Sequence, residues 1–316
     1  MKVLDVITLV ILIGLLGFGI YLWQNLPVGA PVEFKQIAPN LTKMVIPTIS
    51  NEETANEYPN GTQFYPSMRY GDRKVSYWIE ANCTVQKIRD IEYALALISS
   101  KTILQFDKTN NNPEIRYLCS NIAPTSEEEG HFVAGEGGPS EIINTSVYAV
   151  ILTGKVSLYR PEICDEPKIS IHETLHALGF DHSNNPDSIM YPVTNCRQDI
   201  DQYIIDTIND LYKTDSAPDL AIEKISANAT GKYLNFDITV ANLGLQDTSS
   251  AVLTVFAGGG KVKDFDLKEI EIGTRKFLNI QNLRMPNMEN ITIVVQSLIP
   301  NKEISLDNNK VELTVA

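Results

Sequence analysis

The stretch IHETLHALGFDHSNNPDSIMYP, residues 171–192, holds three of the chain's four histidines. The histidines and the acidic residue beside them are His172, Glu173, His176 and His182. Histidines four residues apart on a helix share a face, so their ring nitrogens can converge on one metal ion. Gly179 can adopt a positive φ, which ends the helix and turns the chain back so that His182 becomes a third ligand. The spacing therefore predicts a metal site built on one helix and one turn.

Three neutral imidazoles leave the fourth position of a tetrahedral zinc open, which is typical of catalytic and not of structural zinc. Glu173 is rotated around the same helix, near the ion but not bound to it. A carboxylate in that place suits the general base that acts on a zinc-activated water. The alternative, that these are ordinary surface histidines, must explain three histidines, a glutamate and a glycine all at the required offsets. The pattern thus favours metal-assisted hydrolysis.

The residues after the third histidine extend the pattern and make it more specific. The pattern H-E-x-x-H-x-x-G-x-x-H followed by Met190 resembles that of the metzincin metalloproteases, in which this methionine forms the Met-turn under the zinc. Ser183 and the run Met190-Tyr191-Pro192 are similar to the matrixin branch. The resemblance implies a zinc endopeptidase with one catalytic Zn²⁺, held by the three histidines, and with Glu173 as general base. A calcium site is possible in such a domain but nothing in the sequence indicates one.

Hydrophobic periodicity predicts the order of elements around this motif. A strand over Lys74–Glu80 precedes a helix over Val85–Ser99, for which Thr84 is the expected cap. The remaining expected elements are strands at Ile103–Phe106 and Ile115–Leu118, a glycine-rich loop at 130–141, paired strands at Ser146–Leu152 and Lys155–Tyr159, and a last helix at Asp199–Tyr212. Together with the resemblance, this order predicts an α/β (α+β) domain with a mixed, mostly parallel sheet over residues 66–214.

Four cysteines allow three disulfide pairings, and the residues alone do not choose among them. The cysteines are Cys83, Cys119, Cys164 and Cys196. The resemblance implies that the first strand lies parallel beside the third, which would pair Cys83 with Cys119 and leave Cys164 for Cys196. It also implies that a substrate peptide adds to an edge strand, expected within Ser146–Leu152.

The chain departs from the matrixin pattern in three places. A second, structural zinc needs several histidines ahead of the active-site helix, and only His131 is available, so none is expected. Residues 27–82 contain no cysteine, which excludes a pro-segment that blocks the zinc through a thiolate. Some metzincins place a tyrosine ligand two residues after the methionine, where this chain has Pro192, and Tyr191 is expected to be structural.

The N-terminus predicts an export signal or a membrane anchor. Val6–Trp23 is an 18-residue run without a charge, long enough for a transmembrane helix and longer than most signal-peptide cores. Residues 1–26 are therefore expected to be a single-pass anchor with the N-terminus inside; cleavage near Val28-Gly29-Ala30 would instead give a secreted protein. In either case the rest of the chain lies outside the cytoplasm. Residues 27–65 are rich in Pro, Gly and Asn and favour a linker or a pro-segment.

Residues 218–316 contain no His or Cys and alternate in short apolar runs, which predicts an all-β Ig-like sandwich. The expected strands lie at Leu234–Val240, Ala251–Phe256, Thr292–Val295 and Val311–Val315. Pro218-Asp219-Leu220, Asn242-Leu243-Gly244 and Leu306-Asp307-Asn308-Asn309 resemble the CARDB type of domain, which is related to cell adhesion. Such a domain binds a surface partner or acts as a spacer, and both functions stay open.

The formal net charge of −13 excludes nucleic acid as an expected partner, because phosphate binding needs clustered Lys and Arg. The expected partners are protein or peptide substrates and the membrane. The alternative function is a cell-surface adhesion or binding protein whose zinc site is catalytically idle. Glu173 speaks against this alternative, since a purely structural site does not need that carboxylate.

Overall fold

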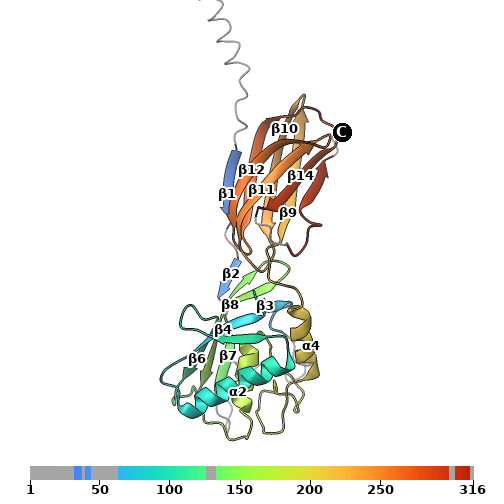
Figure 1. Cartoon of the computed structure of the whole chain (residues 1–316). Helices are drawn as coiled ribbons and strands as arrows, with labels where there is room; N and C mark the ends of the chain where they lie inside the picture. The colour runs from blue at the N-terminus through green and yellow to red at the C-terminus, as the bar shows by residue number, and fades with distance from the viewer. Residues whose placement is uncertain (1–31, 38–39, 44–62, 126–132, 299–302, 314–316) are drawn as a thin grey trace, which may run out of the picture.

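The computed structural model describes residues 32–37, 40–43, 63–125, 133–298 and 303–313. They form a mixed α/β unit and a β-sandwich that lie end to end (Figure 1). The apolar run Val6–Trp23 lies outside the described residues. Among the helices that are described, none is long and apolar enough to cross a membrane. The expected boundaries of the anchor, the linker, the α/β domain and the sandwich stay predictions.

The α/β unit is built on a mixed sheet with the strand order β2-β7-β8-β6-β4-β5, and β3 pairs with β8 outside this path. Its described strands are β2 (Asn40–Lys43), β3 (Met68–Tyr70), β4 (Lys74–Ile79), β5 (Gln105–Lys108), β6 (Ile115–Cys119), β7 (Gly135–Asn144) and β8 (Ala149–Leu158). Strands β3, β4, β5, β6 and β8 are parallel to their neighbours in this group, and β7 runs antiparallel to β8. The expected mixed, mostly parallel sheet is confirmed. The strand predicted at Lys74–Glu80, now β4, lies parallel beside the one predicted at Ile115–Leu118, now β6.

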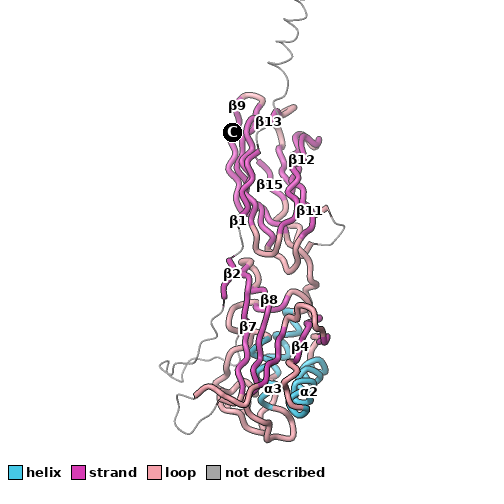
Figure 2. Tube along the Cα trace, turned by 90° about the vertical axis from the view of Figure 1, so that its left-hand side faces the viewer, coloured by secondary structure: helices cyan, strands magenta, loops and turns pink. Residues whose placement is uncertain are grey.

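Three helices accompany the sheet: α2 (Val85–Lys101), α3 (Lys168–Ala177) and α4 (Gln202–Leu211). Helix α2 begins where expected, because the Thr84 side chain accepts a hydrogen bond from the Lys87 N–H at 3.2 Å. Helices α2 and α3 lie on the same side of the sheet (Figure 2). The apolar face of α2, with Ile91, Leu95 and Ile98, is buried in the core that the sheet and α3 share. This packing fixes the helix that carries the histidine motif.

Two strand predictions near the motif are wrong. The glycine-rich stretch expected as a loop forms strand β7, and the hairpin expected around Thr153-Gly154 is one continuous strand, β8. Gly154 does not mark a turn. A glycine stands here because the site has no room for a side chain: an added Cβ would lie 2.4 Å from the Tyr70 hydroxyl. A glycine inside a strand marks such a close approach as often as a turn. The expected edge strand within Ser146–Leu152 is therefore interior, and β7 lies outside it.

The C-terminal unit is a sandwich of two antiparallel sheets, as expected. One sheet has the order β1-β13-β10-β9 and the other has the order β12-β11-β14-β15. The strands are β1 (Val32–Ile37), β9 (Leu220–Thr230), β10 (Tyr233–Asn242), β11 (Thr248–Ala257), β12 (Gly260–Ile270), β13 (Arg275–Arg284), β14 (Ile291–Ser297) and β15 (Lys310–Leu313). The two sheets enclose a second apolar core that is separate from the first.

Strands β1 and β2 lie within residues 27–65, for which the sequence predicts a linker or a pro-segment and no strand. β1 pairs antiparallel with β13 of the sandwich, and β2 pairs antiparallel with β7 of the α/β unit. An edge strand is held by backbone hydrogen bonds, which need no apolar periodicity in the sequence. Only residues 38–39 separate the two strands, so this N-terminal segment joins both units, as Figure 1 shows in blue. Residues 44–62 lie outside the described part of the chain.

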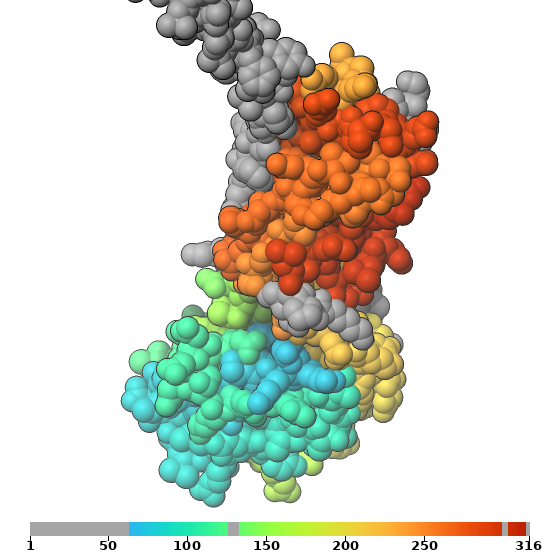
Figure 3. Space-filling view, turned by 45° about the horizontal axis from the view of Figure 1, so that its top comes forward, coloured from blue at the N-terminus to red at the C-terminus, as the bar shows by residue number. Residues whose placement is uncertain are grey.

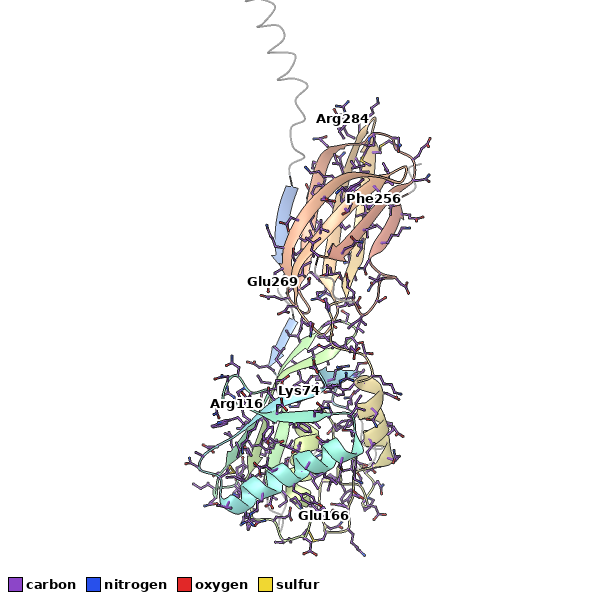
Figure 4. The ribbon with its side chains drawn as sticks, viewed as in Figure 1. Lys74, Arg116, Glu166, Phe256, Glu269 and Arg284 are labelled. Carbon is purple, nitrogen blue, oxygen red and sulfur yellow. A yellow bond between two sulfur atoms is a disulfide. The ribbon has the colours of Figure 1, made fainter. Side chains whose placement is uncertain are left out.

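The two units touch beside the turn between β7 and β8. The Arg275 guanidinium donates to the Ser146 hydroxyl at 3.2 Å and forms a two-bonded ion pair with Glu223. The backbone of Gly71 also approaches the sandwich closely, since an added Cβ there would lie 2.9 Å from the Leu245 carbonyl oxygen. Figure 3 shows the two units in contact on the face that it presents. In Figure 4, Arg284 and Glu166 lie near opposite ends of the resulting long molecule.

Candidate metal centre

Helix α3 carries His172, Glu173 and His176, and every residue of the helix is buried. Its first turn is held by the Glu162 carboxylate, which accepts from the Ile169 N–H at 2.9 Å. A carboxylate at a helix N-terminus satisfies an otherwise unpaired N–H and is favoured by the helix dipole. The helix lies against β7 and β8, so its histidines are fixed relative to the edge of the sheet.

Gly179 ends the helix as the sequence predicts, with φ at +98°. The Phe180 N–H donates to the Leu175 carbonyl and the Gly179 N–H to the His176 carbonyl, which closes the turn. A side chain at position 179 would also meet Met68, whose Cγ lies 2.7 Å from the ideal Cβ position. The chain reverses here and brings His182 beside the two helical histidines.

The three imidazoles converge through their Nε2 atoms. His176 Nε2 lies 3.0 Å from His172 Nε2 and 3.2 Å from His182 Nε2. The Nδ1 atoms of the two helical histidines face backbone carbonyls, that of Ile189 at 2.6 Å and that of Phe180 at 2.7 Å. A carbonyl only accepts, so each Nδ1 carries the proton and each Nε2 presents a lone pair. Converging lone pairs fit a shared cation, and three imidazoles in this arrangement fit zinc.

The surroundings favour the neutral imidazoles that a metal requires. Burial, and to a smaller extent the neighbouring His182, lowers the pKa of His172 to about 4. Burial likewise lowers the pKa of His182 to about 4 and holds that of His176 well below its ordinary value. The ligands are therefore deprotonated across the physiological range, and binding a metal there needs no proton to leave.

Glu173 lies between the metal-binding histidines and strand β7. An added Cβ on Gly135 would lie 2.7 Å from the Glu173 side chain, so this glycine makes room for the carboxylate. Burial, and to a smaller extent the negative charge of Glu136, raises the pKa of Glu173 to about 8. Glu136 in turn accepts a hydrogen bond from the Tyr159 hydroxyl at 2.6 Å. A buried carboxyl with a raised pKa is well suited to accept and return a proton.

Hydrogen bonds connect the turn after the third histidine to the histidine site. Met190 is fully buried, and its carbonyl accepts from the Ser183 N–H at 2.9 Å. The Ser188 hydroxyl accepts from the Met190 N–H and donates to Asp201 at the start of α4. Because the carbonyl of Ile189 also holds His172, this turn positions a metal ligand directly.

The structure contains the two disulfides that the resemblance implies, Cys83–Cys119 and Cys164–Cys196. The second brackets the histidine motif and fixes the loop that follows Pro192. In that loop the buried Gln198 side chain donates to the Pro186 and Val193 carbonyls. His131, the one histidine outside the motif, lies outside the described residues.

Phe64 belongs to the site although nothing in its sequence context pointed to it. Its ring stacks on that of His176, with centroids 5.8 Å apart and planes 26° apart. Its N–H donates to the Gly179 carbonyl at 3.0 Å, and Gln63 forms a bridge with Phe180. More than a hundred residues separate Phe64 from the motif, and a single aromatic residue in a polar stretch carries no periodic signal.

Comparison with known proteins agrees with this geometry. Residues 72–213 match the model of the matrixin family, and this match supports a metallopeptidase. Among solved structures, High choriolytic enzyme 1, a hatching enzyme zinc-protease of the medaka fish Oryzias latipes, is similar at 17% identity. The similarity covers 49% of this chain and 99% of that one, with a TM-score of 0.33.

A CARDB domain is also among the similar structures, as the resemblance of the C-terminal residues implies. It belongs to a Pyrococcus furiosus protein and was solved in complex with di-metal ions. The identity is 21%, the coverage is 30% of this chain and 88% of that one, and the TM-score is 0.26. None of the curated proteins matches the chain.

Proposed function

We propose that the chain is a membrane-anchored zinc endopeptidase that acts outside the cytoplasm. The observation that carries the proposal is the convergence of two buried imidazoles and one half-buried imidazole beside a buried glutamate. A closed structural site has no use for Glu173, whereas hydrolysis needs a base next to the metal.

The histidines and Glu173 would have different roles in the reaction. His172, His176 and His182 would hold the ion, which when bound supplies a Lewis acid that polarises a carbonyl and lowers the pKa of water. Glu173 takes a proton from the attacking water and later passes it to the leaving amine. Its burial under β7 keeps bulk water from competing for that proton.

The substrate would be an extended peptide that pairs with the outer edge of β7. Gly135 and Gly137 lie directly against Glu173, and an added Cβ at Gly137 would lie 2.1 Å from the Glu173 carbonyl oxygen. The stretch Gly135–Gly138 has almost no side chains, and its outer edge has no strand partner among the described residues, although Gly137 and Gly138 are themselves buried. A sheet edge of this kind recognises peptides through backbone hydrogen bonds.

The proposed location rests on one feature of the sequence and one of the structure. Val6–Trp23 is long enough to anchor the chain. The four cysteines are all paired in disulfides, which persist outside the reducing cytosol. The sandwich would hold the catalytic unit away from the membrane or bind a surface partner.

The test compares the full chain with its Glu173→Ala variant, each assayed for bound zinc and for cleavage of a diverse peptide library. We expect both to bind one zinc and only the first to cut, with a chelator abolishing activity. Glu269→Ala removes an exposed carboxylate of the sandwich and should leave cleavage unchanged. Zinc binding without cleavage by any variant would instead favour an adhesion protein with an idle metal site.

A further inference from the structure

The outer edge of β7 is divided into two parts. Strand β2 pairs with the part farther from the metal centre, with Asn40 opposite Asn144 and Lys43 opposite Glu141. The part nearer the metal centre, Gly135–Gly138, has no partner on its outer side among the described residues. Pro139, which has no N–H, lies between the two parts, at a shift in the pairing between β7 and β8. Among the described residues, this sheet edge therefore has an unpaired segment and a paired one in line.

The orientation of β2 shows how a peptide pairs with this edge. β2 is antiparallel to β7, and so is β8 on the other side. A substrate that pairs in the same way runs from the level of Gly138 to the level of Gly135. Its N-terminal residues then lie next to the end of β2, and its scissile bond lies at Gly135, beside Glu173.

We propose that β2 is the end wall of the substrate groove, an inference that rests on the proposed peptidase function. Because β2 already uses the backbone groups of residues 141–144, a substrate cannot pair with them. Only about four substrate residues on the N-terminal side of the scissile bond can join the ladder, one for each residue of Gly135–Gly138. Residues farther toward the substrate's N-terminus must leave the sheet.

The sandwich holds this wall in place. β1 pairs with β13 over six residues, and only residues 38–39 connect it to β2. The sandwich also contacts the turn at the same end of β7, through the hydrogen bond from Arg275 to Ser146. The wall therefore belongs to both units, and the C-terminal unit takes part in substrate selection and is more than a spacer.

The experiment uses the full chain and peptides that share one scissile bond and are lengthened on the N-terminal side from about two to about ten residues. The double variant Leu41→Pro/Thr42→Pro removes two N–H groups from β2, and Leu41→Val/Thr42→Val keeps them as a matched control. Cleavage is measured as kcat/KM. Binding of the same peptides is measured with each chain also carrying Glu173→Ala, so that the wall is tested even if no peptide is cut.

For the unaltered chain and the valine control, affinity should rise with length up to about four residues, by about two- to tenfold for each added pair of hydrogen bonds, and then stay level. For the proline variant the rise should continue to about eight residues. Phe34→Pro/Lys35→Pro, which loosens β1, should extend the limit in the same way; no change there would overturn the role of the sandwich.

A rise that continues past four residues in the unaltered chain would overturn the end wall, and so would identical length profiles for the proline and valine variants. If affinity stopped rising with length on the C-terminal side of the scissile bond instead, the antiparallel orientation of the substrate would be overturned. Length-dependent binding without any cleavage would leave the wall standing and refute the peptidase. Zinc content and thermal melting of each variant show that it is folded.

Discussion

Gly137 lies where strand β7 closely approaches helix α3. Its absent side chain leaves space for the backbone of Glu173, since an added Cβ would lie 2.1 Å from the Glu173 carbonyl oxygen and 2.8 Å from its carbonyl carbon. Backbone on both sides cannot give way as a flexible side chain can. We therefore expect Gly137→Ala to destabilise the α/β unit by about 3 kcal/mol and to reduce cleavage, as seen in urea unfolding and peptide assays.

The matched control is Gly260→Ala. Gly260 lies in the sandwich without a positive φ, and its nearest neighbour to an added Cβ is the Ala257 carbonyl oxygen at 3.6 Å, an ordinary contact. This substitution should change the unfolding free energy by less than about 1 kcal/mol. If both substitutions lowered the unfolding free energy equally, the close approach of β7 to α3 would contribute no more to stability than an ordinary contact.

The residues of the metal centre could be predicted to different extents. His172 and His176 follow from helix geometry alone, because residues four apart always share a face, and Gly179 follows from its freedom to adopt positive φ. Phe64 could not be predicted, since its stacking on His176 depends on how the chain returns to the site from another part of the fold. Local spacing therefore located the ligands but not what packs on them.

The loop after Pro192 is the element whose shape depends most on a covalent constraint. The Cys164–Cys196 disulfide closes it onto the segment ahead of α3, and Gln198 ties its two sides together. Replacing both cysteines with serine should cost about 3 to 4 kcal/mol for a loop of this length. We also expect the preferred cleavage sites in a peptide library to broaden, because the loop lies next to the metal centre.

Cys83→Ser/Cys119→Ser is the matched comparison. It opens a loop of similar length, 36 residues against 32, but it joins the ends of β4 and β6 and does not close the loop after Pro192. A similar loss of stability is expected, with the library profile unchanged once the protein is assayed below its melting temperature. If both pairs altered the profile alike, the effect would come from general loosening and not from the loop.

The predictability of the elements depended on their side chains. Helix α2 and strands β4 and β6 were found close to their true bounds, because buried Ile and Leu recur at the helix or strand period. Strand β7 was taken for a loop because the sequence Gly135–Gly138 has almost no side chains, yet its pairing with β8 needs only the backbone. Strands β1 and β2 were missed for the same reason: edge strands held by backbone bonds leave little trace in the sequence.

At the scale of the whole molecule, two separate cores predict two separate unfolding transitions. One core is shared by the sheet and helices α2, α3 and α4, and the other lies between the two sheets of the sandwich. The matrixin-like part was recognisable because its motif is local. The way the N-terminal strands link the two units depends instead on pairings between residues about a hundred or more positions apart. Such contacts leave no periodic pattern that a single sequence can show.

The metal should act on only one of these transitions. All three histidines proposed to hold zinc belong to the α/β unit, so zinc should stabilise that unit by about 4 kcal/mol at a free concentration roughly 1,000 times Kd. For a unit of this size, a chelator should then lower one melting temperature by about 10 °C. Calorimetry of the full chain measures both transitions at once. A sandwich transition that moved equally would show that the units unfold together, and that the strands β1 and β2 couple them strongly.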